Sequence, residues 1–132
     1  QAEQQSRFNT PPTFALYVAA LMLRWIAANG GLTAMAASCR EKSQRLYACL
    51  DRSELYRCRQ REEDRSTVNV CFELREPALV PLLLAEAEQA GLHHLAGHAA
   101  IGSLRASLYN AMPLAGVERL VAFLQRFERE HG

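Results

Sequence analysis

The sequence contains very little lysine: fourteen of its fifteen basic residues are arginine, and Lys42 is the single exception. Any chemistry that needs a side-chain amine must therefore use Lys42 or draw on another part of the protein. The net charge is also small, because fifteen basic residues nearly balance fourteen acidic ones. The chain lacks the basic excess that is typical of proteins binding nucleic acid or acidic membranes, so we expect neither partner.

Long hydrophobic runs are missing as well. The longest apolar stretch, residues 14–28, is interrupted by Arg24 and falls short of the ~20 residues that span a bilayer. The first residues lack the basic and apolar regions of a signal peptide, and no methionine begins the chain. We therefore expect a cytoplasmic piece of a longer protein, with enough residues for one domain and its core.

The cysteines lack the spacing of a metal or redox motif. No two of them are separated by two residues, and most lie in apolar or amphipathic runs. Reduced thiols in a cytoplasmic protein are the expected state. The residues concerned are Cys39, Cys49, Cys58 and Cys71.

Hydrophobic periodicity predicts an α+β domain. Three- and four-residue spacings predict helices over residues 13–28, with Thr13 as a cap, and over 32–50, 77–90 and 113–129. Pro81 lies in the first turns of the third of these, which leaves a start nearer Leu79 as the alternative. Alternation predicts a strand over 66–74 and short strands near 92–95, 99–101 and 104–109. On the second helix, Lys42 is expected on the solvated side among other charged residues.

Three histidines, His93, His94 and His98, lie close together and could suggest a metal site. Gly91 and Gly97 argue against a helix here, and no carboxylate lies within the segment to complete a ligand set. Ordinary loop or strand histidines are therefore favoured, and no metal site is predicted.

Arg105 is a stronger candidate for a functional residue. It lies within an apolar strand, where an arginine is costly unless it is paired or binds an anion. A planar guanidinium suits bidentate contact with a carboxylate or a phosphate. The residues alone leave both possibilities open, a structural ion pair or an anion-binding site.

Several stretches, taken in order, resemble the C-terminal part of the phosphoserine aminotransferases, which are pyridoxal-phosphate (PLP) enzymes of class V. The two most specific are Asn9-Thr10-Pro11-Pro12-Thr13-Phe14 and Arg105-Ala106-Ser107-Leu108-Tyr109-Asn110-Ala111-Met112-Pro113. Shorter matches are Asn29-Gly30-Gly31, Ala90-Gly91-Leu92, Gly97-His98, Phe127-Glu128-Arg129 and His131-Gly132. The resemblance covers essentially the whole chain.

The resemblance implies a fold type I homodimer that moves an amino group from glutamate to 3-phosphohydroxypyruvate in serine, and in many bacteria pyridoxine, biosynthesis. It assigns residues 1–12 to the end of the large cofactor domain. Residues 13–132 would form the small C-terminal α+β domain, with a short, mainly antiparallel sheet covered by helices and an interdomain helix over 13–30. The N-terminal large domain would be missing from the chain.

The resemblance also implies roles for individual residues. Asn9 and Thr10 match a pair that holds the cofactor phosphate across the dimer interface. Arg105 matches the arginine that binds the substrate α-carboxylate, and His98 matches a histidine of the substrate-phosphate pocket. Ala99 stands where many relatives have arginine, which puts the strength of phosphate binding in doubt and leaves room for a related transaminase with a shifted substrate.

The family's Schiff-base lysine lies in the large domain, and Lys42 matches no catalytic position. We therefore expect no catalytic residue in this chain and no transaminase activity from it alone. The alternative is a standalone, non-catalytic anion-binding or interaction module derived from the same domain.

Overall fold

The computed structural model describes residues 3, 5, 9–97 and 103–132. The chain divides into two units, Gln1–Ala36 and Ala37–Gly132, and each is described by itself. In this part of the chain no single helix is both long and apolar enough to cross a membrane. Only the bent pair Thr13–Ala28 and Gly31–Arg52, taken together, meets such a requirement, and by length and composition alone.

The first unit contains helix α1, Thr13–Ala28. Pro12 takes the N-cap position and Thr13 is the first helical residue, so the expected Thr13 cap is wrong. The helix ends at Asn29, whose side-chain amide donates to a carbonyl one turn earlier at 2.7 Å. Gly30 follows with a φ of +89°, a backbone conformation that glycine adopts without strain.

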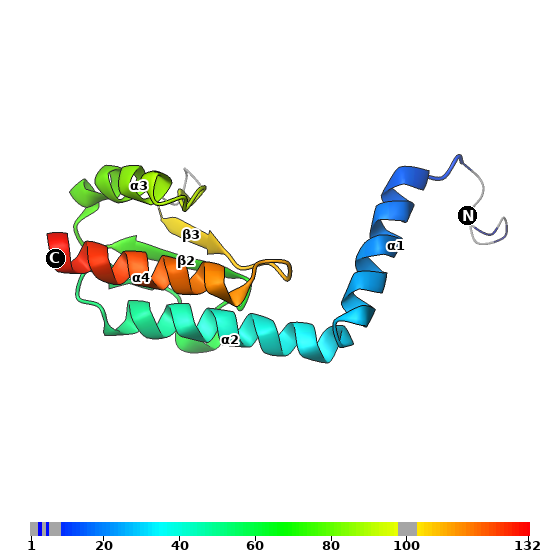
Figure 1. The fold of residues 1–132 in the computed structure, drawn as a ribbon, viewed down its shortest axis with the longest axis horizontal. Helices are drawn as coiled ribbons and strands as arrows, with labels where there is room; N and C mark the ends of the chain where they lie inside the picture. The colour runs from blue at the N-terminus through cyan, green and yellow to red at the C-terminus, as the bar shows by residue number, and fades with distance from the viewer. Residues whose placement is uncertain (1–2, 4, 6–8, 98–102) are drawn as a thin grey trace. The chain divides into compact units, whose positions relative to one another are not determined.

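The second unit contains a three-stranded antiparallel sheet in the spatial order β1-β2-β3 (Figure 1). The strands are β1 Tyr56–Arg57, β2 Asn69–Leu74 and β3 Leu104–Ser107. The register places Cys71 opposite Arg105 and Asn69 opposite Ser107. Successive side chains of a strand point to opposite faces, so these four residues share one face of the sheet. The alternate residues of β2 are buried on the other face: Val70, Phe72 and Leu74.

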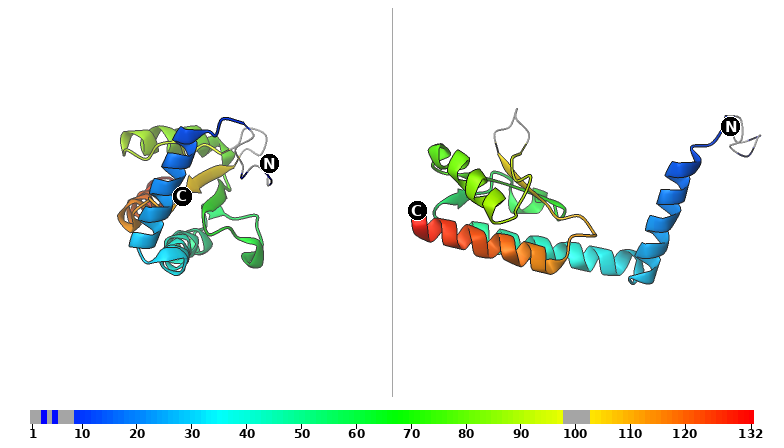
Figure 2. Two further views of the ribbon diagram at one scale, coloured as in Figure 1. Left: turned by 90° about the vertical axis from the view of Figure 1, so that its right-hand side faces the viewer. Right: turned by 45° about the horizontal axis from the view of Figure 1, so that its top comes forward.

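Helices pack against the buried face of the sheet. They are α2 Gly31–Arg52, α3 Val80–Gln89 and α4 Leu114–His131, with short 3-10 turns η2 Glu62–Asp64 and η3 Pro77–Leu79. Figures 1 and 2 show α2 and α4 side by side and running in the same direction. Two contacts fix this pairing: Arg45 bonds Glu118 at 3.0 Å and Ser53 bonds Glu128 at 2.6 Å.

A single hydrophobic core joins the buried face of the sheet to these helices. Phe72 of β2, Leu83 of α3 and Phe127 of α4 are at most 1% exposed. Tyr56 is equally buried, and its hydroxyl donates to the Leu124 carbonyl at 3.0 Å. Burial raises the pKa of the Tyr56 phenol, because the charged form would lose its hydration.

The connection between α2 and β1 is fixed by Glu128 of α4. One carboxylate oxygen accepts the Ser53 hydroxyl at 2.6 Å, the Glu54 N–H at 2.9 Å and the Leu55 N–H at 3.3 Å. The Ser53 hydroxyl oxygen in turn accepts the N–H groups of Leu55 and Tyr56, both at 3.0 Å. The backbone N–H groups of residues 54–56, between the end of α2 and β1, are thus hydrogen-bonded by the side chains of Ser53 and Glu128.

The α+β class, the antiparallel sheet and the long helices expected from the sequence are confirmed. The strand expected at residues 92–95 is wrong: this stretch is irregular and only Ala96 forms a bridge, to Leu104. His94 has a φ of +61°, in the left-handed region that a strand cannot use. The strand expected at 99–101 lies outside the described residues.

The expectation that Lys42 faces solvent is also wrong, because its side chain is only 1% exposed. Three other residues of the same helix are buried. Cys39 lies three residues before Lys42, Leu46 four residues after it and Cys49 seven residues after it. These spacings place all four side chains on one face. Lys42 therefore belongs to the buried stripe of α2.

Candidate functional site

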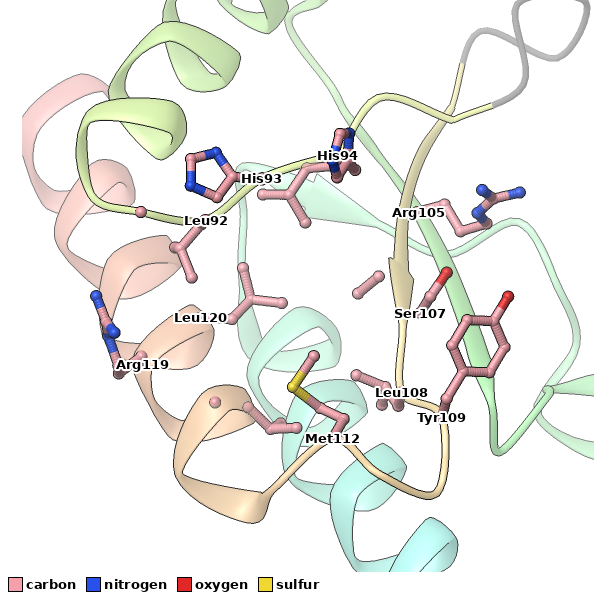
Figure 3. Close-up of a pocket in the computed structure, with 15 residues that line it drawn as sticks. Leu92, His93, His94, Arg105, Ser107, Leu108, Tyr109, Met112, Arg119 and Leu120 are labelled. Atoms are coloured by element: carbon pink, nitrogen blue, oxygen red, sulfur yellow. The ribbon is translucent and has the colours of Figure 1, made fainter. Parts of the chain in front are cut away.

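The open face of the sheet carries the strongest sequence candidate, Arg105. Its side chain is exposed, and Figure 3 shows Arg105, Ser107 and Tyr109 on the same side of β3. Ser107 donates its hydroxyl to the Asn69 side-chain oxygen at 3.2 Å across the strand pair. The face therefore combines a guanidinium with hydroxyl and amide groups, which is a donor set suited to an anion.

Arg105 differs from the arginines at the opposite edge of the sheet. Arg57 and Arg59 both contact the Glu73 carboxylate, at 3.1 and 2.6 Å. Within residues 9–97 and 103–132, no ion pair involves Arg105. The burial cost expected from its apolar strand is also absent, because Arg105 is on the exposed face. Among the described residues, its exposed guanidinium is therefore without an ion-pair partner.

Arg65 illustrates a structural arginine in the same unit. It donates to both oxygens of Asp51, at 2.6 and 2.7 Å, and stacks over the Tyr47 ring at 4.6 Å. The hydrogen bonds to Asp51 raise the pKa of the Arg65 guanidinium. Arg65 is thus held in a bidentate structural ion pair, whereas no ion pair between described residues includes Arg105.

A cavity of about 480 Å³ lies beside β3. Figure 3 shows Leu92, Met112 and Leu120 along its walls, while the Arg105 guanidinium points away from its centre. Arg119 is also part of the lining, and one of its nitrogens donates to the Ala90 carbonyl at 2.9 Å. The cavity is therefore mostly apolar, and it adjoins the polar open face because Arg105, Ser107 and Tyr109 also line it.

Of the three histidines, the structure describes His93 and His94, and neither belongs to a group of three possible metal ligands among the described residues. His93 bonds the Glu88 carboxylate, and this contact lowers the pKa of Glu88. Elsewhere, the possible ligand atoms of Glu86, Glu130 and His131 lie within 4.8 Å of one another. The Arg126 guanidinium lies 3.8 Å from the carboxylates of Glu86 and Glu130, so it already provides a positive charge beside them.

His98 and Ala99, the residues expected at the substrate phosphate, lie outside the described residues. Gly97, just before them, has a structural requirement of its own. A Cβ atom there would lie 1.9 Å from the backbone oxygen of Ser103. Glycine at this position therefore permits the close approach of the two backbone segments.

Asn9 and Thr10 are exposed in the irregular segment before α1. Both belong to the first unit and Arg105 belongs to the second, so the open face is built from second-unit residues alone. The side chains of Asn9 and Thr10 carry amide and hydroxyl donors, which suit a phosphate group.

The site also includes residues that the sequence reasoning did not select. The Lys42 ammonium donates to the carbonyl oxygens of Leu108, Tyr109 and Met112, at 3.2, 2.7 and 3.1 Å. One turn earlier on α2, the Cys39 thiol donates to the side-chain oxygen of Asn110 in the same loop, at 3.2 Å. The helical spacing of Lys42 with the buried cysteines and leucine of α2 was the signal that could have revealed this role.

Comparison with known proteins places the chain in a family. Residues 1–120 match the aminotransferase class-V family, and the chain belongs to it. Within that family it is 48% identical over 129 residues to the phosphoserine aminotransferase of Lactobacillus helveticus (strain DPC 4571). It is 50% identical over 131 residues to that of Bordetella pertussis (strain Tohama I). The alignments cover 98% and 99% of this chain but 35% of each relative, so the chain spans about a third of their length.

Solved structures give the same grouping. The phosphoserine aminotransferase of Bacillus circulans subsp. alkalophilus matches with a TM-score of 0.94 and 36% identity, over 99% of this chain and 37% of that one. A PLP-bound phosphoserine aminotransferase from Trichomonas vaginalis matches with a TM-score of 0.88 and 34% identity, over 95% and 36% of the two chains. The fold described above is therefore the fold of one part of these enzymes.

Proposed function

We propose that this chain is the C-terminal portion of a phosphoserine aminotransferase, which moves an amino group between glutamate and 3-phosphohydroxypyruvate. The observation that carries the proposal is the exposed Arg105 guanidinium on the open face of the sheet, in a chain about half identical to phosphoserine aminotransferases. Both substrates carry an α-carboxylate, and a guanidinium binds a carboxylate through two parallel hydrogen bonds. Serine biosynthesis, and pyridoxine biosynthesis as an extension, are the pathways proposed for the intact enzyme.

The proposed substrate contacts are Arg105 with the α-carboxylate and His98 with the phosphate of the oxo acid. Ala99 beside His98 provides no charge, which weakens the phosphate subsite relative to a chain with arginine there. The open face supports the carboxylate assignment through the Ser107 and Asn69 side chains on the adjoining positions.

The proposed cofactor is PLP, with its phosphate held by Asn9 and Thr10. The two side chains fit this role because they are exposed and offer neutral donors in a segment stiffened by two following prolines. When bound, PLP supplies the electron sink that amino transfer requires. In the family the phosphate contact crosses a dimer interface, so the proposal includes a homodimer.

The proposal also assigns the catalytic amine to a part of the protein outside this chain. Lys42 is the only lysine, and all three of its N–H donors are engaged by backbone carbonyls in the core. Such an amine is neither accessible nor free to bond to a cofactor. We therefore expect this chain alone to lack transaminase activity.

The domain assignment follows from the same proposal. Residues 1–12 end the large cofactor domain, and 13–132 form the small domain together with the interdomain helix over 13–30. The exposed apolar side chains of α1 support this assignment, because an all-round apolar helix is normally covered by further protein. A cytoplasmic location is proposed on the free state of all four cysteines.

The test compares three preparations with PLP, phosphoserine and 2-oxoglutarate: the full-length protein, this chain alone, and this chain mixed with the separately expressed upstream part. We expect turnover by the full-length protein and none by the chain alone. Turnover by the mixture would show that the two parts complement each other. A full-length protein without transaminase activity would refute the proposal and favour the non-catalytic anion-binding module.

A further inference from the structure

We propose that Lys42 is a positioning residue for Arg105: it holds the loop after β3 so that the Arg105 guanidinium meets a substrate carboxylate in the correct orientation. The inference deepens the proposed function and rests on its assignment of Arg105 as the carboxylate-binding residue. It is carried by the burial of the Lys42 ammonium, by its three contacts, and by the position of the loop that it holds.

The Lys42 ammonium is a buried cation without a buried anion. Its side chain is 1% exposed, and none of the ion pairs formed by described residues includes it. Its three N–H donors match the three carbonyl acceptors of Leu108, Tyr109 and Met112. Burial of a charge is costly, and an apolar side chain would fill the same core position without that cost. The amine is therefore better explained by what it holds than by packing.

The three carbonyls belong to one short loop between β3 and α4. The loop closes on itself through the Met112 N–H, which donates to the Tyr109 carbonyl at 2.9 Å. The Asn110 side chain accepts the Cys39 thiol at 3.2 Å, one turn before Lys42 on α2. Two side chains of α2 therefore fasten the loop, and only Lys42 contacts its backbone at several points.

The loop in turn restrains the strand that carries Arg105. Among the described residues, β3 is an edge strand that pairs with β2 on one side. On its other side the Arg105 N–H donates to the Leu95 carbonyl at 2.8 Å. Leu108 lies one residue past the strand, and its carbonyl oxygen accepts a hydrogen bond from Lys42. The Leu108 N–H donates to the Val68 carbonyl at 2.6 Å. Lys42 thus fixes the end of β3 three residues from Arg105.

A bidentate contact depends on orientation, so a loosened strand weakens it without removing the guanidinium. Partial loss of a charge-assisted contact should therefore weaken carboxylate binding by about tenfold. Because Arg105 would bind the carboxylate in both half-reactions, the KM values of the amino donor and the oxo acid should rise together.

The experiment uses the full-length transaminase with Lys42→Met, which keeps an unbranched side chain of nearly the same length and removes its donors. Arg45→Met on the same helix is the matched control, because Arg45 is exposed and only pairs with Glu41 and Glu118. We expect Lys42→Met to raise both KM values about tenfold, with kcat per PLP-loaded site within about twofold of wild type. Arg45→Met should leave both constants unchanged.

A double-mutant cycle tests whether Lys42 acts through Arg105. In an Arg105→Gln background, Lys42→Met should change the KM values by less than about twofold, because the contact it positions is already lost. A full tenfold increase in that background would overturn the inference. So would a Lys42→Met enzyme with a lowered melting temperature but wild-type KM values, since the role would then be structural only.

Two further measurements keep the inference testable. Lys42→Gln retains two N–H donors and should show an intermediate KM if Lys42→Met does not fold. Calorimetric binding of 2-oxoglutarate needs no turnover, and weaker binding by the Lys42 variants than by Arg45→Met is expected. Equal binding would overturn the inference, whereas a folded wild-type enzyme that binds 2-oxoglutarate but lacks turnover would contradict the proposed function instead.

Discussion

Helices α1 and α4 have similar lengths, 16 and 18 residues, but opposite surroundings. In α4 a stripe of five residues is buried in the core of the second unit. In α1 no residue is buried within the described part of the chain, although most of its side chains are apolar. The large exposed side chains of α1 are Phe14, Leu16, Tyr17, Val18, Leu21, Met22, Leu23 and Trp25.

This contrast separates what the chain stabilises by itself from what the proposed domain assignment leaves to further protein. An amphipathic helix such as α4 completes its packing with elements of its own unit. A helix that is apolar on all sides needs a covering on all sides. The second unit should therefore respond to core substitutions in the isolated chain, and α1 should respond only where the rest of the protein is present.

The largest expected effect on stability is from Phe127→Ala in α4. Phe127 is fully buried, and removal of a buried phenylalanine ring costs about 3–5 kcal/mol. Phe14→Ala in α1, where the ring is 78% exposed, should change the free energy of unfolding by no more than about 0.5 kcal/mol. Urea unfolding of the 132-residue chain measures both, and similar costs would contradict the contrast.

The next largest effect is expected for Glu128→Ala. The carboxylate accepts three hydrogen bonds at the α2–β1 connection, so its loss leaves those donors unpaired and should cost about 2–3 kcal/mol. Glu130→Ala is the control, because Glu130 is exposed and contacts Arg126 only at 3.8 Å. If both variants unfold at the same urea concentration, the connection is not held by Glu128.

Gly97→Ala should cost about 1–3 kcal/mol, since the new methyl group would collide with the backbone of Ser103. Gly116→Ala offers a matched comparison. There the methyl group would meet the flexible end of Met112 at 2.7 Å, and alanine favours the helix, so little or no loss is expected. A Gly97→Ala chain with unchanged thermal unfolding would show that the two segments do not approach so closely.

A small effect in the isolated chain, like that of Phe14→Ala, is expected for Trp25→Ala in α1. Trp25 is 39% exposed and should contribute at most about 0.5 kcal/mol to the unfolding of this chain. In the full-length protein the same change should cost about 2 kcal/mol or more, because the ring would be covered there. A small effect in both proteins would contradict the expectation that further protein covers the apolar surface of α1.

The sequence predicted the elements that follow from strong local patterns. The spacing of apolar residues located all the long helices, and the alternation through Val70 and Phe72 located β2. The irregular stretch after Gly91 was mistaken for a strand. Its apolar residues resemble a strand pattern, but His94 adopts a left-handed conformation that short-range alternation does not reveal.

The candidate site was predicted in part. The residues alone left open whether Arg105 forms a structural ion pair or binds an anion. Among the described residues no ion pair includes it, and the expected burial cost does not apply because it is exposed, so its binding of an anion stays a prediction. Lys42 was placed on the wrong face because its neighbours Arg40 and Glu41 are charged. Its role depends on carbonyls 66 to 70 residues away in the sequence, and no local pattern contains such contacts.

The most direct test of the central claim is the specificity constant of Arg105→Gln in the full-length enzyme. The account predicts a loss of about 100-fold in kcat/KM for phosphoserine and for 2-oxoglutarate, since a charge-assisted bidentate contact is removed in both half-reactions. Arg126→Gln, which removes an exposed arginine from α4, should leave the constant within about twofold of wild type. An Arg105→Gln enzyme with wild-type kcat/KM would contradict the claim that this chain supplies the carboxylate-binding arginine.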